Sequence, residues 1–165
     1  MDKYQQSQKN QLFKTDTHDP YRSQRFEGSA ICPQCDSVYQ DGNWTWKSPE
    51  NTVIHDAQAV KCPACRRIDD NMPAGTLTLS GSFLLNHRTE IVNLIEHTEK
   101  KEKAEHALER IINLTDSGDD LIVTTTGIHL VHRIGHALEA AYKGDSDYRY
   151  GDNEYGLSAT WRRDE

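Results

Sequence analysis

The chain has 165 residues and a formal charge of −7, with 35% hydrophobic and 27% charged residues. This length allows one ordinary domain, or a small metal-held module joined to a compact domain of about 90 residues. The low hydrophobic content favours the second arrangement, because a metal ion can replace part of a core. Residues 75–165 hold 10 basic and 16 acidic side chains, and an acidic field repels nucleic acid at long range. The charge therefore argues against a non-specific nucleic-acid-binding protein.

The sequence contains no apolar run of about 18 residues, and the segment MDKYQQSQKNQLFK lacks the hydrophobic stretch of a signal peptide. We therefore expect a cytoplasmic protein that does not enter a membrane. In that reducing compartment, paired cysteines are more often metal ligands than disulfides.

Residues 1–28 are rich in Gln, Lys, Asp, Ser and Thr, a composition that predicts a flexible arm. The arm is either a solubilising tail or a segment that becomes ordered on a partner. Four aromatic side chains are available as anchors in the second case: Tyr4, Phe13, Tyr21 and Phe26.

Four cysteines form two C-P-x-C motifs, with 26 residues between them. They are Cys32, Cys35, Cys62 and Cys65. Each motif can place two sulfur atoms on one side of a tetrahedron, and four thiolates are a common ligand set for structural Zn²⁺. Asp41-Gly42 is a hairpin turn signal between the motifs. The sequence therefore predicts a zinc ribbon over residues 29–70, built from short strands.

A zinc ion held by four protein ligands has no position for water or substrate, so we expect it to be structural. The alternative is a thiol redox protein, because C-P-x-C at a helix start can also be a reactive pair.

Residues 71–75 read as a hinge before an α+β domain at residues 75–165. A strand is predicted over 76–83, followed by a helix capped by Asn86, whose apolar positions recur at helical spacing. The mixed-charge run 99–103 is predicted to be its solvated end.

The segments 110–114 and 121–125 are β-rich and flank a turn sequence, which predicts a hairpin. Thr126 is then expected to cap a second helix, and Gly144 to end it. A last strand is predicted over 157–161. The order β-α-β-β-α-β is typical of a ferredoxin-like domain, with a four-stranded antiparallel sheet and two helices on one face.

His129, His132 and His136 stand at i, i+3 and i+7, a spacing that brings them to one flank of the second helix. They are either a metal or phosphate site or a polar rim. No nucleophile motif or Gly-rich phosphate loop is visible, so we expect no enzymatic activity.

Basic residues beside aromatic residues suit contact with RNA phosphates and bases. The candidates for such contact are Trp44, Trp46, Arg66, Arg67, Arg133, Lys143, Arg162 and Arg163. Alternatively, the tryptophans cover the small core of the ribbon and the arginine pairs are ordinary surface residues.

The stretch VTTTGIHLVHRIGHALEAAYKG, residues 123–144, together with the two upstream C-x-x-C pairs, resembles the nonsense-mediated decay protein three family of large-subunit ribosomal adaptors. It also resembles small bacterial proteins of unknown role with the same layout. The adaptor family carries more C-x-x-C pairs than this chain. The resemblance implies a cytoplasmic, non-catalytic adaptor that binds the ribosome or structured RNA in assembly, quality control or dormancy, with the metal role falling on the four cysteines.

The acidic second half leaves another partner open. It would suit a basic protein, including a basic ribosomal protein, at least as well as RNA. The sequence thus predicts an adaptor with one structural zinc that binds the ribosome or structured RNA, and the alternative is a protein-interaction adaptor without nucleic-acid contact.

Overall fold

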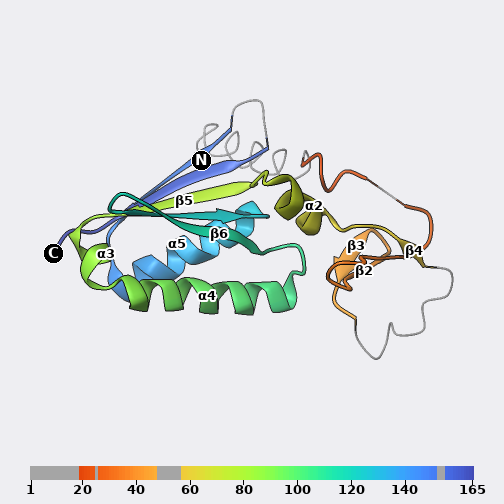
Figure 1. Ribbon diagram of the computed structural model, residues 1–165, viewed down its shortest axis with the longest axis horizontal. Coiled ribbons are helices and arrows are strands. Elements are labelled where there is room, and N and C mark those ends of the chain that lie inside the picture. The colour runs from red at the N-terminus through yellow and green to blue at the C-terminus, as the bar shows by residue number, and fades with distance from the viewer. Residues whose placement is uncertain (1–18, 25, 48–56, 152–154) are drawn as a thin grey trace, which may run out of the picture.

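The computed structural model describes residues 19–24, 26–47, 57–151 and 155–165. Within these residues the chain forms two β-sheets and four helices. Figure 1 shows a small sheet at one end of the molecule, a larger sheet with helices at the other, and helix α2 (Pro63–Asp70) between them. The expected α+β class is confirmed.

The small sheet has the strand order β3-β2-β1-β4. Its strands are β1 (Ala30–Ile31), β2 (Val38–Gln40), β3 (Asn43–Thr45) and β4 (Gln58–Ala59). The predicted hairpin at Asp41-Gly42 joins β2 to β3, and both turn residues have positive φ, as a two-residue hairpin turn requires. The second cysteine motif does not lie in a strand segment, because Pro63 and its neighbours begin α2 instead.

The large sheet has five strands in the order β6-β7-β5-β9-β8. Its strands are β5 (Gly75–Ser80), β6 (Ile111–Ser117), β7 (Asp120–Thr125), β8 (Asp145–Tyr150) and β9 (Leu157–Arg162). The hairpin of β6 and β7 is confirmed. The four-stranded antiparallel sheet is not found, because β5 pairs in parallel with β9 and a fifth strand lies at the edge.

The additional strand β8 lies between the second predicted helix and the last predicted strand, where the sequence analysis predicts no strand. In the structure Ser146, Tyr148 and Tyr150 are half-buried, whereas the residues between them are exposed. This alternation has the period of a strand with one face against the protein, and the acidic residues occupy only its outer face.

Two helices cover one face of the large sheet (Figure 1). They are α4 (Arg88–Glu105) and α5 (Ile128–Tyr142), and the short α3 (Ser82–Asn86) precedes them. Both predicted caps are wrong. Asn86 ends α3, and α4 and α5 begin after His87 and Gly127, neither with a side-chain cap bond.

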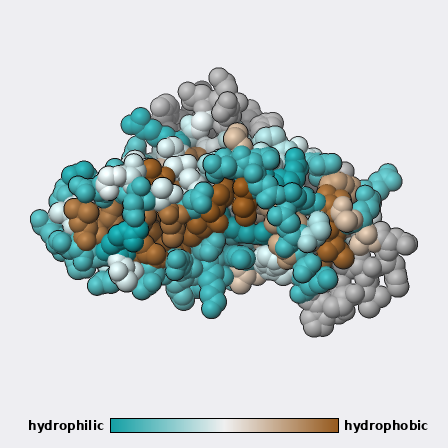
Figure 2. All heavy atoms as spheres, in the orientation of Figure 1, coloured by the Kyte–Doolittle hydropathy of each residue, from teal (hydrophilic) through white to brown (hydrophobic). Residues whose placement is uncertain are grey.

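The main core lies between these helices and the sheet. Leu77, Leu79, Val123 and Trp161 point inward from the strands and are fully buried. Figure 2 shows hydrophobic residues in a band between α4 and the sheet, with hydrophilic residues on both sides. No helix in the described part of the chain is both long and apolar enough to cross a membrane.

The predicted hinge at residues 71–75 is tied to the large sheet. Ala74 is buried, donates its N–H to the Thr125 carbonyl and accepts the N–H of Leu157. These bonds fix the direction in which α2 leaves the sheet.

The predicted arm lies partly outside the described residues. Its described part is attached to the fold, since Asp19 is buried and forms an ion pair with Arg67 at 2.6 Å. The Tyr21 hydroxyl also donates to Asp70 at 2.9 Å. Residues 19–21 are therefore not a free tail.

The loop between α4 and β6 buries two charged side chains, Glu109 and Arg110. The Glu109 carboxylate accepts the N–H of Leu130 in the first turn of α5 at 2.8 Å, and it accepts from Arg22 at 2.7 Å. An anion is favourable at a helix N-terminus. Gly127 makes room for it, because a Cβ there would lie 1.5 Å from a Glu109 carboxylate oxygen.

We predict that Gly127→Ala destabilises the protein by about 2 kcal/mol or more, since a displaced buried carboxylate loses its bonds. Thermal or denaturant unfolding measures this. Gly156→Ala is the matched control, because among the described residues its Cβ would meet only the Ala74 carbonyl oxygen, at 3.4 Å. Equal stability of the two variants would contradict the role given to Glu109.

Candidate metal centre

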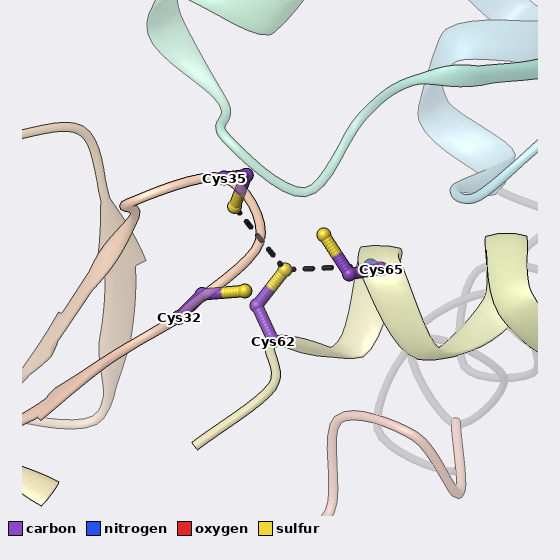
Figure 3. A group of neighbouring side chains, drawn as sticks. All are labelled: Cys32, Cys35, Cys62 and Cys65. Atoms are coloured by element: carbon purple, nitrogen blue, oxygen red, sulfur yellow. Dashed lines mark hydrogen bonds between the residues drawn. The ribbon is translucent and has the colours of Figure 1, made fainter. Parts of the chain in front are cut away.

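The four cysteine sulfur atoms converge on one point, and all lie within 4.8 Å of one another. Figure 3 shows the side chains of Cys32 and Cys35 on one loop, facing those of Cys62 and Cys65 at the start of a helix. The Cys35 and Cys62 sulfurs are 3.7 Å apart. A tetrahedral metal with sulfur ligands at about 2.3 Å separates its ligands by about 3.8 Å, so the cluster fits a metal ion.

A parallel strand pair brings the two motifs together. Strands β1 and β4 pair side by side, and each leads into a cysteine motif at the same end. Because parallel strands end at the same edge of a sheet, Cys32 and Cys62 arrive next to each other.

Each motif has its own local geometry. After Cys32 the chain turns at Asp36, whose φ is +65°, and returns to β2 through a bond from the Cys32 N–H to the Ser37 carbonyl. Cys62 is the N-cap of α2, and its sulfur accepts the N–H of Cys65. Pro63 begins the helix, at a position where a backbone N–H has no partner within the helix. Proline has no N–H, so it loses no hydrogen bond there.

The cysteines are themselves the core of the small module. Cys32, Cys62 and Cys65 are buried together with Ala64, and Cys35 lies at the margin. So few apolar atoms stabilise a module weakly, whereas a bound metal ion can supply about 10 kcal/mol or more.

Arg110 of the large domain contacts the sulfur cluster. Its guanidinium donates to the sulfurs of Cys65 at 3.2 Å and Cys35 at 3.1 Å, and its Nε donates to the Ala107 carbonyl at 2.8 Å. Four thiolates carry more negative charge than one divalent ion neutralises, so a buried cation beside them is favourable. Arg110 thereby links the metal centre to the α+β domain.

The pKa values of three cysteines differ from their usual values, and they differ in opposite directions. A hydrogen bond with Cys62 is the main cause that holds the pKa of Cys35 well below its usual value, and Ser37 and Arg110 add to it. The same bond with Cys35, and then burial, raise the pKa of Cys62; burial raises that of Cys65. These shifts favour the thiolate at Cys35 and the neutral thiol at Cys62 and Cys65.

The two candidate RNA-stacking tryptophans pack within the protein. Trp44 packs against the cysteine cluster and lies 5.4 Å from the Tyr39 ring. Trp46 donates its Nε1–H to the Lys103 carbonyl at 2.7 Å, and the Arg110 guanidinium lies 5.1 Å from its ring. The alternative role of covering the small core agrees with the contacts of Trp44, whereas Trp46 packs against the large domain.

The candidate arginines of α2 also have internal contacts. Arg67 is 4% exposed, pairs with Asp19 and donates to the Met72 carbonyl at 2.7 Å. Arg66 is half-buried, with its guanidinium 5.0 Å from the Tyr21 ring. Arg67 is therefore a structural residue, inaccessible to a partner.

The other basic candidates are dispersed. Arg133 and Lys143 lie on the exposed surface of α5 and just after its end, ten residues apart. Arg162 is exposed, while Arg163 donates to the Tyr142 carbonyl and stacks on Phe83. These residues do not form one basic patch.

The three histidines of α5 do not form one site. His129 lies beside Glu102 of α4, with 3.1 Å between His129 Nε2 and a carboxylate oxygen. His132 hydrogen-bonds to Tyr150 and stacks on Tyr148 of β8, and His136 lies next to it. The carboxylate beside His129 therefore comes from a different helix, α4.

Comparison of the chain with protein-family models, with curated proteins and with solved structures gave no match. The resemblance to ribosomal adaptors therefore stays a prediction from the sequence.

The sequence analysis missed the role of Arg110 and includes this residue only as the first of the predicted strand 110–114. No local signal separates it from other basic residues, because its sulfur partners lie 45 and 75 residues earlier in the chain. A long-range contact of this kind is not visible in a spacing pattern.

We predict that Arg110→Met weakens zinc binding at the cysteine cluster by about 10- to 100-fold, because the thiolates lose a neighbouring cation. Competition of the zinc-loaded protein with a chelator measures this. Arg88→Met is the control, since Arg88 pairs with Asp116 on the exposed surface. Equal zinc affinity of the Arg110→Met variant and the unaltered protein would show that the contact is incidental.

Proposed function

We propose that Cys32, Cys35, Cys62 and Cys65 bind one zinc ion, and that the protein is a non-catalytic adaptor which binds a basic protein surface. The observation that carries the zinc proposal is the closed set of four sulfurs within 4.8 Å. Four thiolates suit zinc or iron, and a set filled by protein ligands gives the ion a structural role.

The ion would hold the small module against the α+β domain. Three of the four sulfurs lie within hydrogen-bonding reach of Arg110, which belongs to the large domain. The free energy of zinc binding then stabilises the junction as well as the ribbon.

The charge distribution favours a basic partner. Residues 75–165 carry six more acidic than basic side chains, from 16 and 10 respectively. The buried charged side chains of this half include Glu102 and Glu109 as well as Arg110, so burial does not remove the acidic excess. An acidic surface speeds association with a basic protein and repels RNA.

RNA binding is the second candidate function, including binding to the ribosome as the sequence resemblance implies. Arg133 supports it, because its side chain is 57% exposed. Lys143 is also exposed, and Arg66 is half-buried. A basic ribosomal protein as partner would combine the two proposals.

A thiol redox role is the third candidate. The position of Cys62 at the N-cap of α2, before Pro63, is one in which a reactive cysteine is often found. The convergence of all four sulfurs, three of them buried, favours metal binding over a single accessible pair.

We predict that the purified protein contains one zinc ion per chain and hides its thiols from a thiol reagent until a chelator is added. Cys62→Ser should lose the ion and make residues 29–70 sensitive to protease, while residues 75–165 stay resistant. Metal analysis and limited proteolysis test this. Bound iron, or two thiols that react rapidly in the native protein, would contradict the zinc site.

The partner is tested by sedimentation of a native lysate with and without RNase, at two salt concentrations. A basic protein partner predicts association that survives RNase and weakens moderately with salt. The double variant Arg133→Gln/Lys143→Gln should leave it unchanged. Association that is lost with RNase, falls steeply with salt and weakens in this variant would replace the protein partner with RNA.

A further inference from the structure

A second group of metal-ligating side chains lies where the end of α4 meets the start of α5. Glu102 and His106 are one helical turn apart at the end of α4, and His129 is the second residue of α5. One Glu102 oxygen, Oε1, lies 3.1 Å from His129 Nε2 and 3.6 Å from His106 Nε2. The three ligand atoms lie within 4.8 Å of one another.

The environment of the Glu102 carboxylate favours binding of a cation. It is only 10% exposed, and its Oε1 atom is buried without a hydrogen-bond partner among the described residues. Two imidazole nitrogens face that oxygen, and the three atoms together form a possible ligand set for a metal ion. A buried carboxylate oxygen without a donor costs free energy, which a metal ion bound by all three atoms would offset.

We propose that Glu102, His106 and His129 bind a divalent transition-metal ion. Two imidazoles and one carboxylate are typical ligands of zinc and of its first-row neighbours. Bonds of about 2.0 to 2.1 Å in a tetrahedron separate the ligand atoms by about 3.3 Å, close to the distances found. The other Glu102 oxygen faces Arg133 Nε at 3.5 Å, which leaves Oε1 for the ion.

This site would be open, unlike the cysteine cluster. His106 and His129 line a pocket of about 590 Å³ that also contacts the small module through Tyr39 and Trp44. Both imidazoles are about half exposed. The coordination positions left by three protein ligands therefore face the pocket, where water or a donor group of a small ligand can occupy them.

The inference goes beyond the proposed adaptor function and does not depend on it. The ligands are separate from the four cysteines, so the two sites can be filled and mutated independently. Cobalt is a suitable probe, because Co²⁺ takes the place of zinc and its absorption bands show whether sulfur is among its ligands.

The test is titration of the full-length, zinc-loaded protein with Co²⁺. We expect one further ion per chain with visible absorption but without thiolate-to-cobalt charge-transfer bands. His129→Asn and Glu102→Gln should each weaken this binding at least about tenfold, while zinc content and the unfolding temperature confirm that the cysteine site and the fold persist. His136→Asn, on the same helix, is the matched control and should bind like the unaltered protein.

Two results would overturn the proposal. One is the absence of any cobalt bound outside the cysteine cluster in the folded protein. The other is undiminished binding by both the His129→Asn and Glu102→Gln variants, which would assign the cobalt to other side chains. Failure of the zinc prediction would appear separately, in the thiol and metal measurements on the cysteine site.

Discussion

Four sulfur atoms around a single point are the constraint on which the rest of this structure depends. Without a cation, their crowding favours one thiolate and keeps neighbouring thiols protonated. With a divalent ion, the cluster carries excess negative charge, and the buried guanidinium of Arg110 lies against three of the sulfurs. Because Arg110 belongs to the large domain, its bonds to the sulfurs also position one domain on the other.

The short loop between α4 and β6 contributes side chains to the cysteine cluster, to the Glu102 group and to the start of α5. His106 lies at its start beside Glu102, Glu109 caps the first turn of α5, and Arg110 reaches the sulfur cluster. Thr126 holds the loop from the other side, with its hydroxyl donating to the Leu108 carbonyl at 2.6 Å. A shift of this loop would therefore disturb the cysteine cluster, the Glu102–His106–His129 group and the start of α5 together.

Local signals predicted the local features. The cysteine spacing, the turn at Asp41-Gly42 and the β6–β7 hairpin depend on neighbours in sequence, and all three are found. The parallel pairing of β5 with β9, and the approach of Glu102 to His129, join segments far apart in the chain. Glu102 also sits in a mixed-charge run that predicts a solvated helix end, yet its side chain is buried because α5 packs over it.

The parallel pair of β5 and β9 also sets an order of folding. Central strand β5 meets on one side a partner that begins about 80 residues later, and Trp161 of β9 fills the core beneath it. All four cysteines precede β5 in the chain. As the chain emerges during synthesis, the four cysteines can come together first, Arg110 can reach them next, and the large sheet can close only last.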